Sequence, residues 1–239
     1  MRFALNIVVC AVIVALSILA AASCNQGGAK NAPYNATTTD TFPDYTDQHL
    51  KVSLARPMDD EWPPIRQRLR LKPGMTVADV GCGVGAVTFL LSKEVGPTGK
   101  VYALEIQQKC IDAVKVKIAD HEINPYNNVS PVLNRPDSTL LDPNVLDVAM
   151  LINIHFHLHD PLLPENVNMI KSIFQAVKPG GRLMIEDANP YEPPDSIEQC
   201  VRNFEAAGFL LESGPDVFGE AQADPTFYLT FKKPSQPAS

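Results

Sequence analysis

A glycine-rich stretch, DVGCGVG at residues 79–85, has the residue types and spacing best suited to chemistry on a ligand. Glycines at positions 81, 83 and 85 follow Asp79, and a helix-like pattern begins directly after them. Because glycine has no Cβ, such a turn lets a ligand approach the main chain, and the first N–H groups of the helix stay available to it. The spacing Gly81-x-Gly83-x-x-Ala86 also satisfies a dinucleotide-binding fingerprint, so the glycines alone leave the ligand open.

A second carboxylate, Glu105, ends the next predicted strand. A carboxylate at this position is placed to accept hydrogen bonds from both ribose hydroxyls of a nucleoside. Each acid also has a purely structural interpretation, Asp79 as a carboxylate at a helix start and Glu105 as a solvated charge. The two acids and the glycine turn together favour a nucleoside site.

The elements that must position these residues alternate along the chain. Apolar runs predict strands at residues 76–80, 101–104, 129–133, 146–152 and 182–186, and helical spacing predicts helices at 86–94, 106–118 and 167–177. A shorter helix is expected after Trp62 and another at residues 196–207. Strict alternation of strand and helix predicts an α/β fold with a parallel sheet covered on both faces. The last two apolar runs, 209–211 and 227–231, have no helix between them and predict an antiparallel pair.

The ordered set of motifs resembles the class I S-adenosylmethionine (SAM) methyltransferases. The resemblance rests on DVGCGVG, on the acid that ends VYALE, on the turn in VKPGGRLMIED and on the terminal strand FYLTFKK, and it covers residues 71–233. It implies a Rossmann-like methyltransferase fold: a doubly wound, mostly parallel seven-stranded sheet with an antiparallel last strand. It also implies SAM as cofactor and methyl transfer to an acceptor.

Site residues follow from the same resemblance. It implies that Asp79 and the main chain of the glycine loop hold the amino acid part of SAM, and that Glu105 holds the ribose diol. Ile106 would pack on the adenine, and Asp137 would read its amino group, while Asn153 would face the methyl-transfer site. The implied cofactor contacts are Asp79, Gly81, Cys82, Gly83, Gly85, Glu105, Ile106, Asp137 and Asn153.

Three histidines, His155, His157 and His159, follow Asn153 at alternate positions. In an extended segment they would share one side, as metal ligands do, but Asp160 is the only carboxylate close to them, so no metal is predicted. Related methyltransferases often carry an aromatic-histidine pair here. His157 is therefore a candidate general base or a polar wall of the pocket, and His157 and Asn153 are the predicted catalytic residues. Methyl transfer needs mainly an aligned nucleophile, so an acid-base pair is not required.

The first 24 residues form an apolar run behind Arg2 and predict a signal peptide or a membrane anchor. Its end, AASC at 21–24, resembles the lipobox of bacterial lipoproteins, in which Cys24 would be lipidated. Ordinary cleavage and a retained transmembrane helix are alternatives. A polar linker at residues 25–41 and a methyltransferase domain at 42–239 follow. The expected location is outside the cytoplasm, membrane-anchored on the periplasmic side.

Composition limits the partners. The formal net charge of −7 and the lack of a basic run argue against nucleic acid. The acceptor, a small molecule or a protein side chain, and the oligomeric state are not predicted. The loops that would form the acceptor pocket are residues 45–62, 155–163 and 189–195. Two alternatives stay open: an exported binding module of the same fold that transfers no methyl group, and an NAD-dependent oxidoreductase.

Overall fold

The computed structural model describes Met58 and residues 61–154, 157–158, 160–188, 196–218 and 226–235. The predicted segments 1–24 and 25–41 lie outside the described residues, so the division into leader, linker and domain stays a prediction. None of the helices within the described residues is both long and apolar enough to cross a membrane.

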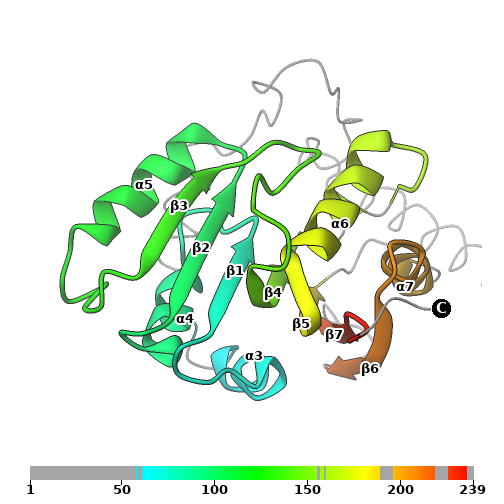
Figure 1. Cartoon of the computed structure of the whole chain (residues 1–239), viewed down its shortest axis with the longest axis horizontal. Helices are drawn as coiled ribbons and strands as arrows, with labels where there is room; N and C mark the ends of the chain where they lie inside the picture. The colour runs from blue at the N-terminus through cyan, green and yellow to red at the C-terminus, as the bar shows by residue number, and fades with distance from the viewer. Residues whose placement is uncertain are drawn as a thin grey trace, which may run out of the picture. The chain divides into compact units, whose positions relative to one another are not determined.

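A seven-stranded sheet forms the centre of the described part of the chain, in the order β3-β2-β1-β4-β5-β7-β6 (Figure 1). Strands β3, β2, β1, β4 and β5 pair in parallel, whereas β7 is antiparallel to both β5 and β6. The predicted α/β fold with a reversed last strand is therefore confirmed. The strands are β1 Thr76–Val80, β2 Lys100–Glu105, β3 Val129–Leu133, β4 Leu146–Ile152, β5 Val177–Ala188, β6 Leu210–Phe218 and β7 Thr226–Lys232.

Helices cover both faces of the sheet. The side chains of a strand point alternately to either side, and here both sets are apolar, so each face is buried by helices. On one face Ala78 and Val80 of β1 share a buried cluster with α6 and α7, and on the other Val77 shares one with α3, α4 and α5. The helices are α3 Trp62–Leu69, α4 Thr88–Val95, α5 Gln108–Ile118, α6 Pro164–Ala176 and α7 Ser196–Ala206.

The arrangement of the connections identifies one edge of the sheet as the place for a ligand. Strand β1 lies between β2 and β4, and the helices that follow β1 and β4 lie on opposite faces. In open α/β sheets, ligands bind outside the carboxyl ends of the strands at such a switch point. Asp79 and Glu105 lie at the carboxyl ends of two adjacent strands, β1 and β2.

Several element boundaries differ from expectation, and three of them have a clear physical reason or concern a predicted motif. Helix α4 begins at Thr88, two residues late, because Gly85 has φ +80° and its left-handed conformation prolongs the turn. Strand β5 begins at Val177 and so includes the Lys-Pro-Gly-Gly stretch expected to be a turn. Strand β6 extends through a polar segment to Phe218, with irregular pairing after Leu211, as an edge strand exposed to solvent allows.

Candidate functional site

The glycine loop folds back onto the end of β2. The N–H groups of Gly81 and Cys82 both donate to the Leu104 carbonyl, at 2.9 Å each. The Gly83 N–H donates to Oε2 of Glu105 at 3.0 Å, and the Gly85 N–H donates to the Cys82 carbonyl at 2.9 Å. The loop therefore has a fixed main-chain path, and the predicted residues of β1, the loop and β2 form one connected group.

Asp79 is a buried acid beside this loop, 4% exposed. Its Oδ2 accepts a hydrogen bond of 2.6 Å from the hydroxyl of Thr88 in α4. Burial raises the pKa of Asp79 to about 6, with a further increase from the Glu105 charge, and the Thr88 hydrogen bond partly offsets both. A carboxylate kept at such a cost is suited to a cationic partner that would replace its lost hydration.

Glu105 is the second buried acid, 7% exposed. Its Oε1 accepts N–H bonds from Ile106 at 2.8 Å and Gln107 at 3.0 Å, in addition to the bond from Gly83 to Oε2. Burial raises the pKa of Glu105, and these three N–H bonds act in the opposite direction. An ionised carboxylate has about four acceptor positions, so the side chain is fixed in place yet retains capacity for a hydroxyl donor.

The segment after β4 packs against the glycine loop. Asn153 has a left-handed φ of +53°, and its N–H donates to the Glu186 carbonyl at 2.8 Å. This turn brings the Ile154 side chain over Gly81, where a Cβ would lie only 2.5 Å from Ile154 Cδ1. Gly81 also has φ +75°, so both its conformation and its neighbour require glycine. Asn153 thus directly precedes the residue that packs on the loop, and its expected role toward the cofactor stays a prediction.

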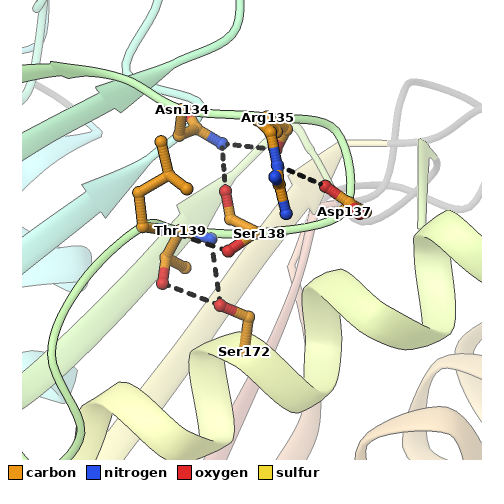
Figure 2. A network of polar contacts seen from close by, with 7 residues as sticks. Asn134, Arg135, Asp137, Ser138, Thr139 and Ser172 are labelled. Carbon is orange, nitrogen blue, oxygen red and sulfur yellow. Dashed lines mark hydrogen bonds and ion pairs between the residues drawn. The ribbon is translucent and has the colours of Figure 1, made fainter.

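The loop after β3 contains Asp137, the predicted adenine reader. Its Oδ1 accepts a hydrogen bond from Arg135 Nε at 3.0 Å, within a turn closed by main-chain bonds between Arg135 and Ser138 (Figure 2). The Asn134 amide donates to the carbonyls of Arg135 and Ser138, and Thr139 bonds Ser172 of α6. The side chain of Asp137 is 41% exposed. Ile106, directly after β2, is partly buried.

His157 is exposed, and its N–H donates to the Ile154 carbonyl at 3.0 Å. His155 and His159 lie outside the described residues, so the arrangement of the three histidines stays a prediction. Among the residues that the structure does describe, no group of three His, Cys, Asp or Glu side chains is arranged to hold a metal.

The cysteine of the loop does not suit nucleophilic chemistry. Cys82 is buried, and burial raises the pKa of its thiol well above the ordinary value, with a further increase from Asp79 and Glu105. Burial likewise raises the pKa of Cys110 to about 12. A reactive cysteine needs the opposite shift, because only the thiolate attacks. Cys82 therefore serves the site through its main chain.

Sequence reasoning missed several residues that the structure brings to this edge. Thr88 lies nine residues after Asp79 and reaches it because α4 turns back along β1. Lys117 of α5 donates to the Val84 carbonyl of the glycine loop. Glu186 and Asp187, at the end of β5, are 3% and 1% exposed. The only signal for the last two was an acidic pair at the end of an otherwise apolar strand.

The described residues also line a cavity of about 190 Å³ between α6, α7 and the segment after β4. It contains neither of the buried acids nor a residue of the glycine loop. Among the residues described, a bare main chain between two buried carboxylates, the arrangement that a nucleoside site needs, lies at the switch point.

Comparison with known proteins agrees with this geometry. Residues 71–221 match a family model described as "Methyltransferase domain". The chain is 28% identical over 128 residues to demethylmenaquinone methyltransferase of Lactobacillus johnsonii, which covers 53% of this chain and 50% of that protein. It is 28% identical over 142 residues to arsenite methyltransferase of Halobacterium salinarum, covering 55% and 34% respectively. The chain thus spans about half the length, or less, of these curated relatives.

A solved structure shows the same fold. The crystal structure of a SAM dependent methyltransferase from Aquifex aeolicus matches with a TM-score of 0.62 at 24% identity, covering 79% of this chain and 99% of that one.

Proposed function

The chain belongs to the methyltransferase domain family, and we propose that it transfers a methyl group from SAM to an acceptor. The observation that carries the proposal is the bare main chain of Gly81 to Gly83, held between the buried carboxylates of Asp79 and Glu105. SAM combines a cationic amino group, a ribose diol and an adenine. The predicted site residues at this edge include a carboxylate for the amino group, a carboxylate for the ribose diol and residues that suit the adenine.

The residues have separate tasks in this proposal. Asp79, when ionised, holds the amino group of the cofactor, and Glu105 accepts a hydrogen bond from the ribose diol at its remaining acceptor position. Ile106 packs on the adenine, and Asp137 accepts from its amino group. The main chain of Gly81, Cys82, Gly83 and Gly85 lets the amino acid part lie close.

The bound cofactor supplies a methyl group on a sulfonium, which is already a good leaving group. The protein therefore has to align the attacking atom of the acceptor and exclude water from it. In this proposal Asn153 faces the attacking atom, and His157 forms a polar wall of the pocket or accepts a proton from the acceptor.

The acceptor is not assigned. The two relatives above are named for demethylmenaquinone and for arsenite, so family membership does not select one acceptor. The two alternatives differ in what they bind: a module without transfer activity binds SAM, and an oxidoreductase binds NAD. The family match and the acid directly before the glycines support the SAM site over the NAD site.

A labelling experiment tests transfer. The full chain, purified in detergent, is incubated with methyl-labelled SAM and with small-molecule or protein fractions of cells. Label should enter one fraction with the wild type and not with Glu105→Gln, while Glu122→Gln, an exposed glutamate, serves as the matched control. Binding of SAM without label transfer to any fraction would support the module instead, and binding of NAD alone would support the oxidoreductase.

Membrane anchoring outside the cytoplasm forms a second part of the proposal, supported by the apolar run and AASC sequence at the N-terminus. Fractionation of expressing cells tests it. The wild type should remain with membranes after a carbonate wash and be reached by protease from the periplasm, whereas Cys24→Ser should lose lipid labelling. A wild type that stays in the cytosolic fraction would contradict the anchor.

A further inference from the structure

The second half of the glycine loop is enclosed by α4 and α5. A Cβ on Gly85 would lie 3.1 Å from Cε2 of Phe89 in α4 and 3.3 Å from Cγ2 of Val114 in α5. Lys117 lies three residues after Val114, so it shares that face of α5. Helix α5 therefore presents both an apolar and a cationic side chain to the loop.

Lys117 forms a direct contact with the loop main chain. Its Nζ donates to the Val84 carbonyl at 2.9 Å, across 33 residues of sequence, and lies 6.0 Å from the centre of the Phe89 ring. Burial lowers the pKa of Lys117. A hydrogen bond from a charged donor is stronger than one between neutral groups, and partial burial limits its competition with water.

This contact completes the fixation of the loop. The N–H groups of Gly81, Cys82 and Gly83 are bonded to Leu104 and Glu105 of β2, and the peptide group that follows Val84 is held on its N–H side by the bond from Gly85 to the Cys82 carbonyl. Lys117 orients that peptide from the opposite side. A loop already held in its binding conformation loses less conformational entropy when a ligand binds.

We propose that Lys117 is a positioning residue for the cofactor, fixing the glycine loop through the Val84 carbonyl in the form that receives the amino acid part of SAM. The proposal rests on the proposed function. Lys117 touches neither the cofactor nor the acceptor in this role, so its effect should be confined to ligands that contact the loop. It should also depend on the positive donor rather than on the length of the side chain.

The test compares two ligands by calorimetry on the full chain. S-adenosylhomocysteine carries the amino acid part, whereas methylthioadenosine has the same nucleoside and sulfur without it. Lys117→Met should weaken S-adenosylhomocysteine about 10-fold, the effect of losing roughly one hydrogen bond, and change methylthioadenosine less than about twofold. Lys117→Arg should restore most of the affinity.

Lys115→Met is the matched control, because Lys115 is an exposed residue of the same helix that pairs with Asp112 at 3.3 Å. It should bind both ligands as the wild type does. Unchanged S-adenosylhomocysteine binding in Lys117→Met, or an equal loss for both ligands, would overturn the positioning role. A wild type that binds neither ligand would instead overturn the proposed function itself.

Discussion

Replacing Asp79 by asparagine should make the ligand-free protein more stable while weakening its site. The aspartate is buried, and burial raises its pKa from 3.8 to about 6. Asparagine removes the charge, keeps nearly the same shape and can still accept the Thr88 hydrogen bond of 2.6 Å. The substitution therefore isolates the cost of holding a charge at this position.

The size of this change in stability follows from the linkage between proton binding and folding. Because the folded-state pKa is raised, the contribution of Asp79 to stability is fully present below pH 3.8 and is lost as the pH rises through about 6. A shift of roughly two units corresponds to about 3 kcal/mol at pH 8, as an upper limit. For a chain of this length, that is a rise in Tm of roughly 6–12 °C.

Urea unfolding, followed by the fluorescence of Trp62, the single tryptophan of the chain, measures the effect at pH 5 and pH 8. Asp79→Asn should exceed the wild type in free energy of unfolding at pH 8, and the difference should shrink at pH 5. Asp142→Asn, at an exposed position, is the control and should change stability little at either pH. With S-adenosylhomocysteine present, the order should reverse, because only the wild type gains from the ligand.

A variant that is less stable than the wild type at pH 8 without ligand would refute this reasoning. It would mean that the Asp79 carboxylate already has a stabilising partner in the folded chain. Burial of the Asp79 charge would then not lower the stability of the ligand-free protein, and a cationic ligand would not be needed to compensate it.

Three further outcomes can be measured. Thr88→Val removes a hydrogen bond to the Asp79 carboxylate and should raise the pKa of Asp79 further. The pH below which SAM binding is lost, near 6 in the wild type, should therefore rise in Thr88→Val and return to the wild-type value in Thr88→Ser. Calorimetry from pH 5 to 8 measures both variants. Gly81→Ala should abolish SAM binding, because the added Cβ would meet Ile154 and because a non-glycine residue at φ +75° costs about 1–2 kcal/mol. Adding Ile154→Ala to this variant removes the clash and should recover part of the affinity in the same titration. Lys233→Met should lower the free energy of unfolding by about 1–3 kcal/mol, because the Lys233 ammonium donates to two carbonyls at the end of α6 and to an asparagine. These contacts are far from the site, so SAM binding should not change. Urea unfolding measures the loss of stability.

The sequence allowed the buried strands to be predicted well. Strands β1, β3 and β4 have the expected bounds, because each is a short run rich in apolar residues. Strands β1 and β4 lie inside the sheet, where parallel strands are buried on both faces. The edge strand β6 was underestimated, since its polar residues face solvent and only pairing with β7 defines it. Glycine in a left-handed turn delayed α4 beyond its hydrophobic pattern.

The site residues likewise divide into those that the local sequence predicts and those that depend on tertiary packing. The glycine loop, Asp79 and Glu105 were predictable because their spacing around two strand ends is local in sequence. The contact from Lys117 to Val84 joins residues 33 apart, and its existence depends on how α5 packs against the loop. The salt bridge between Arg135 and Asp137 likewise depends on the turn after β3, which no periodic pattern specifies.

The most direct test of the central claim is a calorimetric titration of S-adenosylhomocysteine, and separately of NAD, into the full wild-type chain and Glu105→Gln at pH 8. The buried acids around the glycine loop predict binding of S-adenosylhomocysteine but not NAD, and a loss of at least about 10-fold in the variant, as expected when a charged acceptor is removed. Equal binding by wild type and variant, or binding of NAD alone, would contradict the assignment of this edge as a SAM site.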